Sequence, residues 1–146
     1  MPDYPEKLKE ILADFAFVTT RSERADLLID WADHFQKVPA GVAMPPYPED
    51  HRVPFCESEA YLWAEEQTDN TLKFHFAVEN PQGLSGMALA AILDAALSGA
   101  PVDQVAQVSP DIVLEIFGND ISMGKGQGLM SMVSMVRATA RRHITG

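Results

Sequence analysis

The residue with the most distinctive chemistry in this chain is its only cysteine, Cys56. It lies in the run HRVPFCESE (residues 51–59), between a proline-rich stretch and an aromatic segment. A single thiol can neither close an internal disulfide nor build a metal site of several thiolates. Any chemistry at Cys56 is therefore that of one nucleophilic sulfur.

Charged side chains on both sides of Cys56 act on its thiol in opposite directions. A thiol attacks as the thiolate, which nearby cations favour and nearby carboxylates disfavour. Arg52 and His51 act in the first direction, whereas Glu57 and Glu59 act in the second. The sequence leaves open whether this cysteine is activated.

The place of Cys56 in the fold has two interpretations. Free cysteines are most often small buried hydrophobes. Here, however, four prolines lie between residues 39 and 48, and Pro54 follows shortly before the cysteine. These prolines favour a loop-to-strand junction over a core position, and Phe55 indicates partial shielding of the thiol by an apolar neighbour.

Other patterns that could support chemistry fail on their spacing. The segment from Gly118 to Gly126 resembles a phosphate-binding loop, but it has five residues between the glycines instead of four and glycine after Lys125. The four histidines are too widely spaced in the sequence for a recognisable metal motif, and a second cysteine is missing. We therefore expect neither a metal nor a cofactor in this protein.

Length and charge narrow the possible partners. The chain has 146 residues and a net charge of -10, and 47% of its residues are apolar. This fits one globular domain over residues 1–146, and the acidic charge argues against nucleic acid. The apolar stretch 87–97 is too short for a membrane span. With a single thiol and no visible signal peptide, we expect a cytoplasmic protein.

The elements that position Cys56 can be predicted from hydrophobic spacing. Asp3 marks the start of a first amphipathic helix, and Thr20 with Glu23 forms a capping box for a second helix. Residues 37–54 are rich in proline and glycine, which predicts one long loop, and loops of this length are often functional.

An antiparallel hairpin follows, with strands over about 60–64 and 72–78. In its second strand Leu72, Phe74, Phe76 and Val78 point inward, and Lys73, His75 and Ala77 point outward, as in a half-buried strand. Further helices are expected over about 84–98, 102–108, 110–117 and 127–143. The order predicts a single-domain α+β fold whose small antiparallel sheet, of about three strands, packs against N- and C-terminal helices.

Several of these segments resemble one known family, the SufE-type sulfur acceptors. The similarity runs over nearly the whole chain and centres on VPFCESE at 53–59, which leads to Trp63. It begins with PEKL at 5–8 and ends with GQGL at 126–129, which is similar to the family's closing Arg-Ser-Gln-Gly-Leu segment. Proteins of this family take persulfide sulfur from a cysteine desulfurase and pass it to iron-sulfur cluster assembly.

The resemblance implies a sulfur-transfer accessory protein rather than a stand-alone enzyme. Cys56 corresponds to the acceptor cysteine that bears the persulfide. Pyridoxal phosphate belongs to the partner desulfurase, which the acceptor stimulates, and an iron-sulfur scaffold is the recipient. The loop and partner-binding positions implied by the resemblance are Arg52, Phe55, Glu57, Ser58 and Lys125.

Three positions depart from the family pattern. The family usually has Gly-Cys-Gln-Ser, whereas this chain has Phe55 and Glu57 around the cysteine and keeps Ser58; Lys125 replaces a common arginine. Glycine permits a positive φ that phenylalanine largely forbids, and lysine lacks the planar fork of arginine. An alternative is therefore an interaction module that docks on a desulfurase and regulates it without carrying sulfur.

Overall fold

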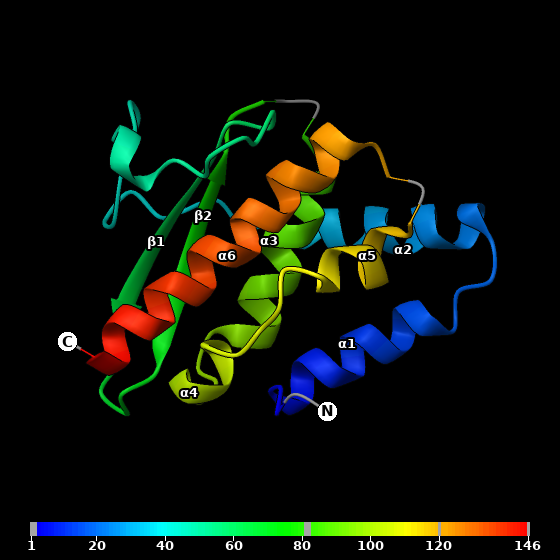
Figure 1. Cartoon of the computed structure of the whole chain (residues 1–146). Coiled ribbons are helices and arrows are strands. Elements are labelled where there is room, and N and C mark those ends of the chain that lie inside the picture. Colours follow the sequence, from blue (N-terminus) through cyan, green and yellow to red (C-terminus); the bar gives the residue numbers. More distant parts are fainter. Residues whose placement is uncertain (1–2, 81–82, 120, 146) are drawn as a thin grey trace.

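Six α-helices and two antiparallel strands make up the computed structural model, which describes residues 3–80, 83–119 and 121–145 (Figure 1). The predicted domain bounds, residues 1 and 146, lie outside the described residues. The α+β class is confirmed. In chain order the elements are α1 (Glu6–Ala16), α2 (Arg21–Asp33), the 3-10 helix η1 (Glu49–His51), β1 (Ala60–Glu66), β2 (Leu72–Val78), α3 (Leu84–Leu97), α4 (Val102–Val105), α5 (Ile112–Phe117) and α6 (Met123–Thr145).

The sheet has two strands in the described part of the chain, not about three. Its register pairs Leu62 with Phe76, and the two flanking segments touch it only through isolated bridges, at Lys37 and at Arg52. Prolines follow each of these segments within two residues, and a proline has no N–H to extend a ladder. A third strand therefore does not form.

Of the two helix starts predicted from capping residues, one is confirmed and the other is wrong. The capping box is confirmed, because the Thr20 hydroxyl oxygen accepts the Glu23 backbone N–H at 3.1 Å and the hydroxyl donates to the Glu23 carboxylate. The prediction for Asp3 is wrong: α1 begins after Pro5 without a side-chain cap, and Asp3 instead accepts a bond from Gln104.

Helix α6 begins four residues earlier than the predicted start at Gln127. Ser122 stabilises this first turn, because its hydroxyl accepts the Lys125 N–H and its carbonyl accepts the Gly126 N–H. The glycines at 124, 126 and 128, which suggest a loop by composition, are therefore helical.

The main core lies between the inner face of the hairpin and the surrounding helices. Helix α3 is central to it and contacts α1, α2, α6 and β2. In Figure 1, α6 runs diagonally in front of α3 and the hairpin, and it contacts both α3 and β1. The largest fully buried side chains there include Phe15, Phe74, Phe76, Leu89, Ile92 and Met132.

The outer face of the hairpin is also buried, contrary to the prediction of a half-buried sheet. The proline-rich segment covers it with Val38 and Tyr47, which pack with Tyr61, Trp63 and Ala77. Ala77 is only 1% exposed. Strand periodicity identifies the two faces, but it carries no information about a loop that folds back over one of them.

Tyr47 is the polar exception in this outer cluster. Its hydroxyl is buried and, within the described residues, has no hydrogen-bond partner. Burial raises the pKa of Tyr47 above 10.0, and the nearby Glu79 carboxylate raises it further. The folded protein thus holds this proton more tightly than the unfolded chain does, so the associated stability is present below pH 10 and lost as the pH rises through the raised pKa.

We predict that Tyr47→Phe raises the free energy of unfolding by about 1 kcal/mol, because it removes a buried hydroxyl without a partner. Urea denaturation at neutral pH measures this. Tyr4→Phe is the control: the Tyr4 hydroxyl accepts the Ser109 N–H at 3.1 Å, so its loss should lower stability by about 1 kcal/mol. Equal destabilisation by both variants would contradict the prediction.

Candidate functional site

Cys56 lies at the junction between η1 and β1, as predicted. The segment that holds it, residues 53–59, is called here the Cys56 loop. The Val53 N–H donates to the Ala60 carbonyl at 2.8 Å, and the Glu59 N–H donates to the Cys56 carbonyl at 3.2 Å. These two bonds fold the segment into a compact turn at the start of β1.

Cys56 is nevertheless a core residue, so the prediction that favoured a junction over a core position is wrong on burial. Cys56 is only 7% exposed and belongs to the main core cluster. Val53 and Ala60, on the two sides of the loop, are fully buried in the same cluster. The loop's charged residues face solvent while the sulfur-bearing residue faces inward.

Helix α6 explains why the loop is held so tightly. A Cβ built on Gly128 would lie 2.6 Å from the Phe55 carbonyl oxygen and 3.0 Å from Cys56 Cα. Contacts this short are not tolerated by any real Cβ, so only glycine lets the helix backbone come this close. The role of Gly128 in positioning the loop was not predicted from the sequence, although glycines at the alternate positions 124, 126 and 128 were the available signal.

The N-terminal end of α3 holds the other side of the loop at Ser58. A Cβ on Gly86 would lie 2.9 Å from Ser58 Oγ, and one on Gly83 would lie 3.0 Å from Ser58 Cβ. Ser58 is thus packed against helix backbone, as Cys56 is. The Cys56 loop is seated between the amino-terminal ends of α3 and α6, both of which supply glycine at the contact.

Hydrogen bonds from the end of β2 complete the support. Asn80 donates its backbone N–H to the Ser58 carbonyl at 3.1 Å and its side-chain amide to the Glu57 carbonyl at 3.2 Å. The Glu79 N–H donates to the Glu59 carbonyl at 3.2 Å. The hairpin's pairing therefore extends past its strands and fixes the backbone on the C-terminal side of Cys56.

Phe55 adopts the left-handed backbone geometry that a phenylalanine is expected largely to forbid. Its φ is +60°, and that of Glu59 is +53°. A non-glycine residue in this region costs about 1–2 kcal/mol, which the surrounding contacts must over-determine. Here the Gly128 contact and the bonds of the loop impose it.

The same geometry turns the Phe55 ring outward, so the predicted shielding of the thiol by this ring is wrong. The Phe55 side chain is 70% exposed, whereas the neighbouring Cys56 is buried. The apolar surroundings of the sulfur come instead from the main core. The ring is left as a large apolar group on the surface beside the buried thiol.

The charged candidates are spread around the loop. Arg52 reaches the Glu49 carboxylate at 3.7 Å, and its charge acts on Tyr61, whose pKa is raised mainly by burial and lowered in part by Arg52. Glu57 is exposed beside α6, since a Cβ on Gly124 would lie 3.9 Å from its Oε1. Lys125, also exposed, is in the first turn of α6. The structure thus brings Phe55, Glu57, Ser58 and the turn containing Lys125 around Cys56.

Two features are absent from the described residues, a metal-binding cluster and a membrane-spanning helix. No cluster of three or more histidine, cysteine, aspartate or glutamate side chains within them has the arrangement to bind a metal ion. None of the described helices combines the length and apolarity needed to cross a membrane.

Comparison with known proteins gives one family and one fold. Residues 9–140 match the family model for SufE, described as an Fe-S metabolism associated domain. A solved structure, the solution structure of a hypothetical protein from Thermus thermophilus, is similar over 98% of this chain and 99% of its own, with 22% identity and a TM-score of 0.75. At that identity it supports the fold alone. No curated protein sequence matches significantly.

The close contact at Gly128 predicts that alanine substitutions at two glycines on adjacent turns of α6 change the free energy of unfolding in opposite directions. Gly128→Ala should lower the free energy of unfolding by about 1–3 kcal/mol, because the added methyl overlaps the Phe55 carbonyl. Gly124→Ala, whose nearest contact is 3.9 Å, should instead gain up to about 1 kcal/mol from helix propensity. Urea denaturation of both variants measures the difference; a gain in both would disprove the close contact.

The backbone of Phe55 predicts that glycine is better than alanine at this position. Phe55→Gly should be more stable than Phe55→Ala by about 1 kcal/mol, because both remove the ring and only glycine relieves the left-handed φ. Phe17, which is 82% exposed with φ of -77°, is the matched control, where alanine should equal or exceed glycine. Thermal unfolding of the four variants measures these differences. A higher melting temperature for alanine than for glycine at both positions would argue against the strained geometry of Phe55.

Proposed function

The chain belongs to the SufE family of Fe-S metabolism associated domains, and from this premise we propose that Cys56 accepts sulfur from the persulfide of a cysteine desulfurase. The Cys56 thiolate attacks the outer sulfur of the donor persulfide. A new S–S bond forms at Cys56, the donor's S–S bond breaks, and its electron pair leaves on the donor's cysteine as a thiolate. The overall step needs no external oxidant, because one persulfide is consumed as another forms.

The burial of Cys56 is the observation that supports this proposal best. A persulfide is readily cleaved by other thiols, and thiol exchange depends on access to the sulfur. At 7% exposure, the position of Cys56 limits that access. The chain also has no second cysteine to resolve the persulfide into an internal disulfide. Both features suit a carrier that must keep its sulfur until a recipient arrives.

Loading and unloading require the Cys56 loop to open, because a buried sulfur cannot be reached by a partner's cysteine. The strained φ at Phe55 lowers the cost of leaving the closed geometry. The exposed Phe55 ring and Glu57 are placed to meet a partner first, and Lys125 lies on the neighbouring turn of α6. We assign these three residues, with Ser58, to partner binding; Arg52, paired with Glu49, supports the loop from the preceding turn.

The partners and location follow from the same proposal. Pyridoxal phosphate remains on the desulfurase, which this chain stimulates as an accessory protein, and an iron-sulfur scaffold in the cytoplasm receives the sulfur. The second transfer reverses the first: the recipient's thiolate attacks the outer sulfur, and Cys56 leaves as the thiolate. No cofactor is required on this chain.

A second candidate function is docking and regulation of a desulfurase without sulfur transfer. The observation in its favour is the exposed aromatic ring of Phe55 beside a buried thiol, which suits recognition better than exchange. The two functions separate at one atom, because docking needs the surface of the loop and sulfur transfer needs the Cys56 sulfur.

We predict that the protein gains one sulfur atom when incubated with cysteine and a pyridoxal-phosphate desulfurase from the same cell. Intact-mass spectrometry without reductant measures the gain, and peptide mapping should locate it on Cys56. Reductant should remove it. Cys56→Ser, which replaces only the sulfur atom with oxygen, is the control and should gain no sulfur.

The alternatives give a different pattern. The chain is a docking regulator if the unaltered protein gains no sulfur and if both it and Cys56→Ser still raise desulfurase turnover. Sulfur on a desulfurase that never reaches this chain, with turnover unchanged, would contradict both functions.

A further inference from the structure

A cleft of about 240 Å³ opens at the edge of β2 that faces away from β1. Its walls come from α3, from β2 and from residues 35–39, which follow α2. The cleft is separate from the Cys56 loop: Gly86 of α3 contacts that loop, and Asp94 lies eight residues further along α3, or about 12 Å at the rise of a helix. Nothing in the proposed sulfur transfer uses it.

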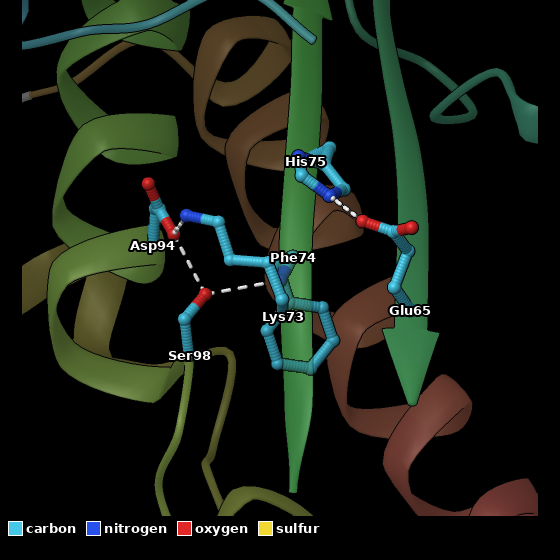
Figure 2. A network of polar contacts seen from close by, with 6 residues as sticks. All are labelled: Glu65, Lys73, Phe74, His75, Asp94 and Ser98. Carbon is cyan, nitrogen blue, oxygen red and sulfur yellow. Dashed lines mark hydrogen bonds and ion pairs between the residues drawn. The ribbon is translucent and has the colours of Figure 1, made fainter. Parts of the chain in front are cut away.

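Asp94 is the acidic group of the cleft, and half of its carboxylate is already engaged. Lys73 Nζ and Ser98 Oγ both donate to Asp94 Oδ1 at 2.6 Å, and Ser98 Oγ in turn accepts the Phe74 N–H at 2.9 Å. Figure 2 shows this network joining α3 to β2. Within the described residues no protein donor reaches Asp94 Oδ2, which leaves one carboxylate oxygen available to a ligand.

The backbone of β2 adds a second acceptor. The N–H and C=O of one residue leave an antiparallel strand on the same side. The Phe74 N–H points away from β1 toward Ser98, and the Phe76 carbonyl accepts the Val38 N–H at 2.8 Å on that same edge. The Phe74 carbonyl therefore also points away from β1, at the edge where the cleft lies.

The opposite side of the cleft is cationic. Lys37 lines it and is exposed, and no acidic side chain of the described residues lies within ion-pair distance of its ammonium group. His75 also lines the cleft; it is 11% exposed, and its Nε2 contacts the Glu65 carboxylate (Figure 2). Two lysines against one aspartate make the cleft locally positive in a chain with a net charge of -10.

We propose that this cleft binds a small zwitterionic α-amino acid. The ammonium group is placed at Asp94 Oδ2 and the Phe74 carbonyl, and the carboxylate is placed at Lys37. Phe35, Pro39 and Ala91 supply apolar walls for a short side chain. In liquid water each molecule occupies about 30 Å³, so a cleft of about 240 Å³ has room for roughly eight water molecules. A ligand of this size is a compact molecule.

Both charges of the ligand are required by this arrangement. A simple carboxylate would leave the Asp94 and Phe74 acceptors without a donor, and a simple amine would leave Lys37 without an anion. Each half-ligand makes only part of these charge-assisted contacts, so each should bind more weakly than the zwitterion.

The test is an amide-resolved NMR titration of the full chain with L-alanine, with acetate and with methylammonium, at matched ionic strength. L-alanine should shift the amides of residues 36–38, 73–76 and 90–94 with saturation and a Kd of roughly millimolar, as expected for so small a ligand. Lys37→Gln should weaken this binding at least about tenfold, the value of one charge-assisted contact. Lys7→Gln, an exposed lysine remote in sequence from the cleft, should leave it unchanged.

Three results would overturn the proposal. These are L-alanine shifts that do not saturate or that lie outside the cleft, acetate binding as tightly as L-alanine, and unchanged affinity in Lys37→Gln. Because Lys37 is exposed, its substitution should not unfold the protein, and the spectrum of the free variant verifies this directly. The state of Cys56 does not enter the measurement, so its outcome is independent of sulfur transfer.

Discussion

The close approach of the α6 backbone at Gly128 to the Phe55–Cys56 peptide is the constraint on which the rest of the site depends. In the closed state, the loop backbone can lie this close to α6 only because residue 128 has no side chain. The thiol is held in the core, the Phe55 φ is forced to +60°, and the ring of that residue is turned out to solvent. The absence of a Cβ at Gly128 thus allows the arrangement in which Cys56 is buried and the neighbouring Phe55 is exposed.

This arrangement connects folding to the proposed chemistry. The loop is secured by glycine contacts from two helices and by hydrogen bonds from the end of β2, and none of its contacts is a covalent link. Such a turn can open locally without unfolding the hairpin or the helices. A carrier of a reactive sulfur needs both states, a closed one for storage and an open one for exchange.

Much of the fold could be predicted from the sequence because local residue patterns determine where its helices and strands begin and which face they bury. Thr20 and Glu23 define a helix start within one turn, and the alternation from Leu72 to Val78 defines a strand and its inner face. The errors concern contacts between distant segments. Neither the loop over Ala77 nor the strained Phe55 has a local signal, since each is imposed by tertiary packing. The burial of Cys56 agrees with the usual tendency of free cysteines, but the prolines around it favour a loop-to-strand junction instead. The cleft with Lys37 and Asp94 likewise joins residues 57 positions apart in a chain whose local patterns indicate only a loop and a helix.

The central claim is that Cys56 stores sulfur in a sheltered turn. The most direct test loads the protein with radiolabelled persulfide sulfur, removes the desulfurase, and follows release of the label to a small thiol in the folded protein and in urea. The account predicts label on Cys56 that is lost much more slowly from the folded protein than from the unfolded chain. Equal release rates in the two states, or label that never reaches Cys56, would contradict it.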